Sequence, residues 1–339
     1  MNTKLLEVEN LKTYFFLDEG TVKAIDGVSL SIGRKETLGV VGESGCGKSV
    51  TALSILRVLA AKGKIVEGTI KLYGDEYSPQ GYIDLAQLDP NGPDIRKIRG
   101  KEIAMIFQEP MTSFSPVYTV GNQIMEAILL HQDVNHTQAR DLAIDMLRKV
   151  GIPSPEERID EYPYQLSGGM RQRAMIAMAL CCNPKLLIAD EPTTALDVTI
   201  QAQILDLMRQ LQDELGMSIM LITHNLGVVA EMSQHVAVMY LGRIVESAPV
   251  DELFHNPLHP YTKALLKSIP KVGKKTKKRL ESIKGTVPDA YNIPPGCSFH
   301  RRCPQYRKEL CNTVVPNLVE IAPRHEVACL LYDEVRRHG

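Results

Sequence analysis

The sequence lacks an apolar run long enough to cross a bilayer. Runs such as residues 186–189 and 236–240 are far shorter than the roughly 20 residues of a membrane-spanning helix. The N-terminal stretch also lacks the apolar core of a signal peptide, and it contains Glu7 and Glu9. We therefore expect a protein that is neither exported nor inserted into a membrane.

The sequence also has no excess charge of either sign, because 39 basic residues balance 40 acidic ones and the formal net charge is −1. This balance excludes a generally basic surface, which is the usual basis of nucleic-acid binding. The content of 44% hydrophobic and 23% charged residues is typical of a globular protein. A chain of 339 residues exceeds the usual size of one compact core, which favours two domains or one domain with an appendage.

Hydrophobic patterning predicts a mixed α/β fold. Three segments alternate apolar and polar residues, which predicts an antiparallel sheet: residues 5–16, 22–32 and 65–73. Five others are short and almost wholly apolar, which is typical of buried strands in a mostly parallel sheet: residues 38–41, 103–107, 186–189, 218–222 and 235–239. Helical spacing over residues 120–131, 137–150 and 168–182 predicts an inserted helical subdomain at about residues 112–182.

The strongest motif is GESGCGKS, which matches the phosphate-loop pattern between an apolar run and a helical stretch. Backbone N–H groups of such a loop surround phosphate oxygens, and the following helix adds the positive end of its dipole. We expect Lys48 to contact the β- and γ-phosphates of ATP and Ser49 to coordinate Mg²⁺. The predicted nucleotide-binding residues are Gly42, Ser44, Gly45, Cys46, Gly47, Lys48 and Ser49.

A second motif is the apolar strand at residues 186–189, which ends in Asp190 and Glu191. Asp190 is suited to coordinating Mg²⁺, and Glu191 to polarising a water molecule toward the γ-phosphate. Two carboxylates at the end of a strand are weak evidence alone. Together with the phosphate loop they predict an active-site pair.

The third motif, LSGGMRQR at residues 166–173, resembles the LSGGQ signature of the ATP-binding-cassette (ABC) ATPases. The resemblance extends from residue 5 to about residue 249. It implies a phosphate-loop cassette with a RecA-like α/β core, an antiparallel β subdomain and an inserted α-helical subdomain. The implied domains are a nucleotide-binding domain at residues 1–249 and a small cysteine-rich extension at residues 250–339.

The same resemblance implies that two cassettes act together. In this family Ser167 caps a helix that begins with Gly168 and Gly169 and contacts the γ-phosphate held by the opposite subunit. Such a helix terminus attracts anions. ATP is then enclosed between two subunits, and its hydrolysis opens the dimer. Asp197 resembles the D-loop aspartate of the same family.

Further roles follow from the resemblance. Gln108 resembles the Q-loop glutamine, which is also expected near Mg²⁺, and His224 resembles the switch histidine, with a buried structural role as its alternative. Phe15 is the best candidate for the ring that stacks on adenine, with Tyr14 and Phe16 as competitors and a core role as the alternative. The expected catalytic residues are Glu191, His224, Gln108 and Lys48.

Residues 256–262, NPLHPYT, and the tail that follows resemble the C-terminal region of the oligopeptide and dipeptide permease ATPases, and Met170 is similar to their D-type subunit. This implies a peripheral protein at the cytoplasmic face of the cell membrane. Its implied partners are an F-type ATPase subunit or a second copy, two membrane-spanning permease subunits and an extracellular peptide-binding protein, without nucleic acid. The alternative is a soluble cassette in nucleic-acid repair or translation, which the balanced charge disfavours.

Cysteine is scarce, and four of the seven cysteines lie in the last 43 residues: Cys297, Cys303, Cys311 and Cys329. Their spacing lacks the tight pairs that are usual for structural zinc, and looser spacing suits a larger iron-sulfur cube. The family resemblance also implies a [4Fe-4S] cluster. Zinc, with His300 or His325 as a substitute ligand, and free thiols or a disulfide are the alternatives. The other three cysteines, Cys46, Cys181 and Cys182, are interpreted as packing residues.

The run at residues 271–284 is rich in basic residues. We interpret it as a solvated linker, with a surface for acidic partners or lipid as the alternative.

Overall fold

The computed structural model describes residues 4–74, 76–108, 113–194, 196–268, 283 and 285–332. The chain divides into two units, of which the first comprises residues 1–5, 33–36 and 88–222 and the second residues 6–32, 37–87 and 223–339. The basic run at residues 271–284 lies outside the described residues, except for Ile283. Within the described ranges, no helix is both long enough and apolar enough to cross a membrane.

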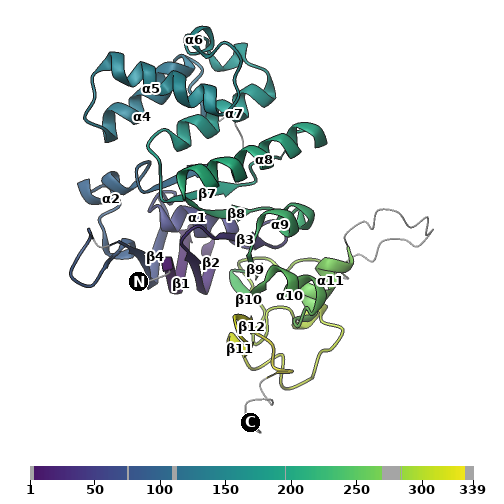
Figure 1. The fold of residues 1–339 in the computed structure, drawn as a ribbon. Coiled ribbons are helices and arrows are strands. Elements are labelled where there is room, and N and C mark those ends of the chain that lie inside the picture. The colour runs from purple at the N-terminus through teal and green to yellow at the C-terminus, as the bar shows by residue number, and fades with distance from the viewer. Residues whose placement is uncertain are drawn as a thin grey trace, which may run out of the picture. The chain divides into compact units, whose positions relative to one another are not determined.

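The first unit combines parallel strands with a group of helices (Figure 1). Strands β6 (Ile103–Ile106), β7 (Leu186–Asp190) and β8 (Ser218–Ile222) lie in the order β8-β7-β6 and pair in parallel. Every residue of β7 and β8 is buried, which explains why these segments are almost wholly apolar. The helices are α2 (Pro93–Ile98), α4 (Val120–His131), α5 (His136–Lys149), α6 (Pro155–Arg158), the 3₁₀ turn η2 (Pro163–Gln165), α7 (Gly168–Leu180) and α8 (Val198–Leu215).

Side-chain caps explain where these helices begin. Thr119 precedes α4 and accepts a hydrogen bond from the Asn122 N–H at 3.2 Å. Asn135 and Gln138 form a reciprocal capping box at the start of α5, with distances of 3.0 and 2.9 Å. The helices predicted at residues 120–131, 137–150 and 168–182 are therefore confirmed, with end points that differ by at most two residues.

The second unit contains two groups of strands. One is a four-stranded sheet in the order β2-β1-β4-β5, formed by β1 (Lys4–Leu17), β2 (Gly20–Gly33), β4 (Gly63–Tyr73) and β5 (Tyr82–Asp84). The other has the order β11-β12-β10-β9-β3 and is formed by β3 (Thr37–Val41), β9 (His235–Tyr240), β10 (Arg243–Pro249), β11 (Val319–Ala322) and β12 (His325–Val327). The helical segments are α1 (Lys48–Ile55), η1 (Leu85–Gln87), α9 (Leu226–Met232), α10 (Val250–His255), α11 (Pro260–Lys267) and η3 (His300–Arg302).

The pairing of these strands confirms most of the pattern analysis. β1 pairs with β4, and β4 with β5, in antiparallel fashion, while β3 and β9 pair in parallel. The sequence patterns did not predict β10, β11 and β12. In the structure β10 pairs with β9, β12 with β10 and β11 with β12, each in antiparallel fashion. β11 and β12 have only four and three residues, which is too short for periodicity to be informative.

Three fully buried aromatic rings anchor the C-terminal segment, which comprises the described residues 285–332, in the second unit. The ring of Phe299 lies 5.3 Å from that of Tyr240 and 5.4 Å from that of Tyr261, and the two tyrosine rings are 4.8 Å apart. Tilted and edge-on contacts at these distances are favourable beyond the burial of area alone. Cys297 and Cys303 pack against the same cluster, so the cysteine-bearing segment is part of this hydrophobic core.

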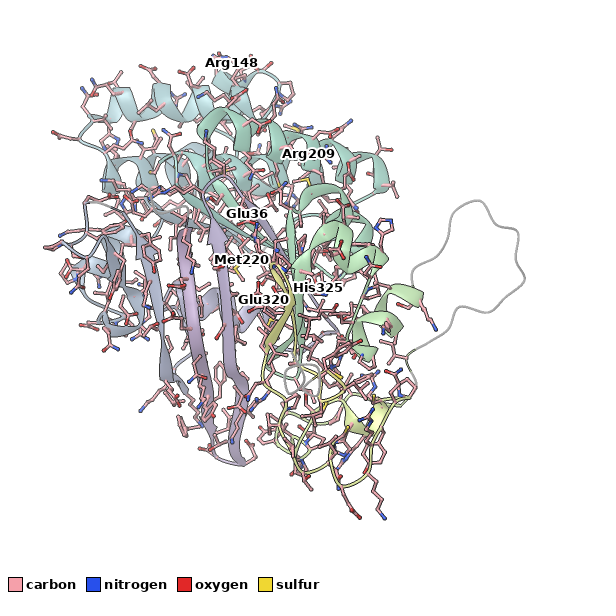
Figure 2. All side chains as sticks on the ribbon, turned by 60° about the horizontal axis from the view of Figure 1, so that its bottom comes forward. Glu36, Arg148, Arg209, Met220, Glu320 and His325 are labelled. Atoms are coloured by element: carbon pink, nitrogen blue, oxygen red, sulfur yellow. The ribbon has the colours of Figure 1, made fainter. Side chains whose placement is uncertain are left out.

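A buried carboxylate also holds the tail. Glu246 of β10 accepts hydrogen bonds from the N–H groups of Leu258 and His259 at 2.7 and 2.8 Å, and from His325 Nε2 at 2.9 Å. Figure 2 labels His325 on the short strand β12. Burial alone would raise the pKa of Glu246, but the hydrogen bonds from His325, Leu258 and His259 outweigh burial and lower it.

We expect Glu246→Gln to lower the free energy of unfolding by about 1–3 kcal/mol at neutral pH, because charge-assisted hydrogen bonds are lost. A folded-state pKa below the ordinary value gives stabilisation that is complete above about pH 4.3 and is lost as the pH falls through the folded-state pKa. The difference in Tm between wild type and variant, measured by circular dichroism, should therefore shrink on acidification. A difference that does not change with pH would contradict this role.

Candidate nucleotide-binding site

The phosphate loop of the second unit connects β3 to α1. All five residues of β3 are buried, and the chain leaves the strand at Gly42. Gly42 and Gly47 have φ angles of 155° and 105°, and a Cβ would lie 2.3 Å from the carbonyl oxygen of Met239 at Gly42 and 2.6 Å from that of Ala24 at Gly47. Only glycine fits at both positions. Ser44 and Gly45 are exposed between them, so the open side of the loop is available to a ligand.

Lys48 and Cys46 lie on the inner side of the loop. The Lys48 ammonium donates to the carbonyl oxygens of Gly42 at 2.8 Å and Glu43 at 3.2 Å, and its side chain is buried. The Cys46 side chain is buried as well, and burial raises the pKa of its thiol. Cys46 therefore offers a ligand its backbone rather than its sulfur. Ser49 follows in the first turn of α1 and is partly exposed.

Two predicted catalytic residues of the first unit lie in direct contact. Gln108 Nε2 donates to Glu191 Oε2 at 3.2 Å, and Thr194 Oγ1 donates to the same oxygen at 2.8 Å. The contact arises because β6 and β7 are parallel neighbours, so the residues that follow them emerge at the same edge. Glu191 has a φ of 50°, an uncommon backbone conformation that is often found at functional positions. Asp190 is the last, buried residue of β7.

Sequence analysis missed two residues that support this pair. Thr194 carries the hydroxyl that contacts Glu191. Gln172 of α7 is buried and donates through Nε2 to the carbonyl of Pro192, which joins the signature helix to the segment after Glu191. A polar residue on the buried face of a helix was the available signal, because buried amides need partners.

The signature and the D-loop residue occupy exposed helix starts in the first unit. Ser167 caps α7 and accepts from the Met170 N–H at 3.3 Å, while Asp197 caps α8 and accepts from the Ile200 N–H at 3.0 Å. Ser167, Gly168 and Asp197 are exposed, and Gly169 is partly exposed. This exposure leaves the motif available to a second molecule.

His224 and the candidate adenine ring belong to the second unit. His224 is exposed, so the alternative of a buried structural histidine is wrong. Phe15 is half-buried, with its ring against Gly63. The hydroxyl of Tyr14 donates to Asp26 at 2.7 Å, and Phe16 is 46% exposed. Phe15 remains a predicted adenine contact, and Phe16 is the more exposed competitor.

These features define a nucleotide-binding protein of the phosphate-loop class. The family described as "ABC transporter" matches residues 25–194, and the family described as "Oligopeptide/dipeptide transporter, C-terminal region" matches residues 245–311. The chain belongs to the ABC transporter family and carries the C-terminal region of its oligopeptide and dipeptide transporters. It is an ATPase of this type, as the motifs predicted.

Full-length relatives agree with this classification. The chain is 52% identical over 331 residues to the "Oligopeptide transport ATP-binding protein AppD" of Bacillus subtilis, with 97% of each chain covered. It is 46% identical over 325 residues to the "Dipeptide transport ATP-binding protein DppD" of Escherichia coli, with 96% of each covered.

Solved structures show the same fold. A dimer of the ATP-binding cassette MJ0796, described as a post-hydrolysis state bound to ADP and Pi, has a TM-score of 0.62 and 25% identity, and the match covers 73% of this chain and 99% of that one. The cbiO1 protein of Clostridium perfringens has a TM-score of 0.61 and 26% identity, with 75% and 92% covered. The predicted cassette fold is confirmed.

We expect Glu191→Gln to bind ATP normally but to hydrolyse it at least about 100-fold more slowly, because the amide cannot accept a proton from water. The variant should also accumulate as an ATP-bound dimer. Phosphate release, equilibrium nucleotide binding and gel filtration check these outcomes. Glu214→Gln, which alters an exposed carboxylate at the end of α8, is the matched control. Normal turnover in Glu191→Gln would exclude Glu191 as the base.

Proposed function

We propose that this chain is the ATP-hydrolysing subunit of an importer for dipeptides or oligopeptides. The observation that carries the proposal is the full-length similarity to AppD and DppD, whose names describe oligopeptide and dipeptide transport. The match of the C-terminal region at residues 245–311 supports it independently of the cassette. The alternative of a soluble cassette in nucleic-acid repair or translation has no comparable support, and the net charge of −1 disfavours it.

The proposed catalytic roles rest on the geometry within each unit. Glu191 acts as the base, held in place by Gln108 and Thr194. Lys48 turns from the loop carbonyls to the nucleotide phosphates, and exposed His224 contacts the γ-phosphate. By the chemistry of their side chains, Ser49 in the second unit and Gln108 and Asp190 in the first each offer the hard oxygen donors that Mg²⁺ prefers, and Mg²⁺ would neutralise phosphate charge. A nucleotide-binding domain at residues 1–249 and an extension at residues 250–339 remain our proposed boundaries.

The proposed assembly contains two ATPase subunits, either this chain with an F-type paralogue or two copies of this chain. The exposed caps Ser167 and Asp197 support it, since their helix starts are free to meet the partner's nucleotide.

Two membrane-spanning permease subunits and an extracellular peptide-binding protein complete the proposed assembly, and place this chain as a peripheral protein at the cytoplasmic face of the membrane. A groove along α4 includes Tyr118, Glu126 and Leu130. Tyr118 and Leu130 are 57% and 73% exposed, and we assign this apolar surface to a permease subunit.

Deletion of the gene should abolish uptake of labelled di- or tetrapeptides by cells of the source organism, and the wild-type gene should restore it. Glu191→Gln should not restore uptake, because import requires ATP hydrolysis, while Glu214→Gln should. Pull-down of the wild-type chain from detergent-treated membranes should recover two multi-span subunits. Unchanged peptide uptake in the deletion strain, with recovery of nucleic acid instead of membrane subunits, would reject the importer in favour of the alternative.

We further propose that the tail cysteines hold a [4Fe-4S] cluster. The thiols of Cys297, Cys303, Cys311 and Cys329 are unpaired with one another and lie within electrostatic reach. Burial first, and then the charges of the other three cysteines, raise the pKa of Cys329 to about 11. Burial, with Cys303 and Cys311, likewise raises the pKa of Cys297 to about 11.

The support for a cluster over zinc is the spacing of the four cysteines in the sequence, which lacks the tight pairs that are usual for structural zinc. Looser spacing suits ligands arranged around a larger iron-sulfur cube. Among the described residues, the structure groups no three His, Cys, Asp or Glu side chains closely enough to hold one metal ion. When bound, the cluster would crosslink a tail that has little regular structure.

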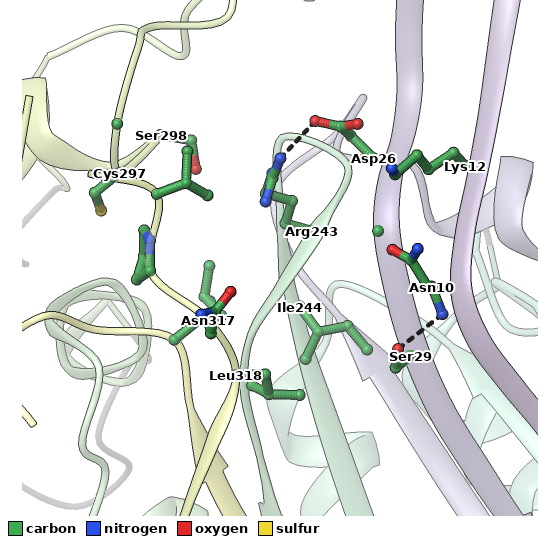
Figure 3. Close-up of a pocket in the computed structure, with 16 residues that line it drawn as sticks. Asn10, Lys12, Asp26, Ser29, Arg243, Ile244, Cys297, Ser298, Asn317 and Leu318 are labelled. Carbon is green, nitrogen blue, oxygen red and sulfur yellow. Dashed lines mark hydrogen bonds and ion pairs between the residues drawn. The ribbon is translucent and has the colours of Figure 1, made fainter. Parts of the chain in front are cut away.

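Cys297 also lines a pocket of about 250 Å³ together with Ser298, Asp26 and Arg243 (Figure 3).

Anaerobically purified protein should be brown and contain about four iron and four sulfide ions per chain. Cys303→Ser should lose most of the iron, because one ligand is removed. Cys182→Ser, which changes a cysteine outside the tail, should retain it. Stoichiometric zinc without a chromophore would overturn the cluster assignment while leaving the transport proposal intact.

A further inference from the structure

The phosphate loop contains a carboxylate, that of Glu43, for which nucleotide chemistry provides no role. Arg302 of the C-terminal segment pairs with it in bidentate fashion, with Nη1 to Oε2 at 2.6 Å and Nη2 to Oε1 at 3.0 Å. The two residues are 259 positions apart in sequence. The Arg302 side chain is only 4% exposed, whereas the Glu43 side chain is 25% exposed. The bidentate geometry and the burial of the guanidinium make the pair stronger than an ordinary surface ion pair.

The position of Arg302 is set by the aromatic core. Its guanidinium carbon lies 5.8 Å from the ring centre of Tyr240 and 5.9 Å from that of Phe299. Nη1 also contacts the Tyr240 hydroxyl at 3.4 Å. Arg302 ends the turn η3, and Cys303 follows it directly. The contacts with Tyr240 and Phe299 therefore fix the Arg302 guanidinium beside the phosphate loop.

Glu43 is the point at which this contact acts on the loop. Its N–H donates to the Tyr261 hydroxyl at 2.9 Å. Its carbonyl oxygen accepts from the Cys46 N–H at 3.3 Å and from the Lys48 ammonium at 3.2 Å. The backbone and side chain of Glu43 are thus both held, and its carbonyl lies beside the lysine that is to bind phosphate.

The negative charge of the Glu43 carboxylate suggests what the contact with Arg302 does. A free carboxylate in the second position of a phosphate-binding loop repels the phosphates of ATP, and at short range such repulsion is substantial. We propose that Arg302 is a positioning residue for nucleotide binding, which neutralises Glu43 and holds its carboxylate in a fixed position. The C-terminal segment is on this basis part of the nucleotide site. The proposal rests on ATP binding by this family. It does not require the proposed iron-sulfur cluster or a peptide substrate.

Titration of the full-length protein with a fluorescent ATP analogue and Mg²⁺ tests the proposal. Arg302→Ala should weaken binding about tenfold, or about 1.4 kcal/mol. It should raise the KM for ATP with little change in kcat, because the residue acts on binding. Removing the carboxylate as well, in Glu43→Gln/Arg302→Ala, should restore the affinity to within about threefold of wild type. The defect of Arg302→Ala should also shrink at high salt, which screens repulsion.

Two further variants separate charge from packing. Arg301→Ala removes the exposed neighbouring arginine and should bind ATP like wild type. Arg302→Lys retains the positive charge but loses the bidentate geometry, so it should bind ATP more tightly than Arg302→Ala and more weakly than wild type. The proposal is overturned if Arg302→Ala binds within twofold of wild type. It is equally overturned if the double variant or Arg302→Lys is as weak as Arg302→Ala.

Discussion

The phosphate loop passes so close to neighbouring backbone that two of its positions have no space for a side chain. At Gly42 the obstacle is the carbonyl of Met239 on β9, and at Gly47 it is the carbonyl of Ala24 on β2. Gly242, between β9 and β10, also donates its N–H to the carbonyl of Cys46 at 2.9 Å. The shape of the loop, and with it the direction of its N–H groups, therefore depends on the placement of three strands.

A parallel sheet supplies the corresponding constraint for catalysis. Because β6 and β7 run in the same direction, Gln108 and Glu191 leave the sheet at one edge and meet, although 83 positions separate them. Glu191 combines this contact with a left-handed φ, so its carboxylate is directed by both backbone and side-chain partners. A general base gains from such positioning, since proton transfer requires a fixed geometry.

The C-terminal segment follows a different principle. Its regular elements are few and short, so the segment gains little from ladder hydrogen bonds and depends on a small number of specific contacts. Phe299 packs against Tyr240 and Tyr261, His325 donates to buried Glu246, and Arg302 pairs with Glu43. Each of these contacts reaches the cassette, which is why a segment with so small a core of its own can be ordered. The same contacts connect the tail to the phosphate loop.

Sequence by itself determined the cassette class, the strands and helices with clear periodicity, and the residue types of each motif. These properties are local, because a phosphate loop is defined by eight consecutive residues and a helix by its caps. Only the tertiary structure decided that Thr194 and Gln108 share one oxygen of Glu191, that β10, β11 and β12 continue the strands of the second unit, and that Arg302 reaches Glu43. Such pairs leave no periodic trace in one sequence, because chain reversal and packing, rather than spacing, bring the two side chains together.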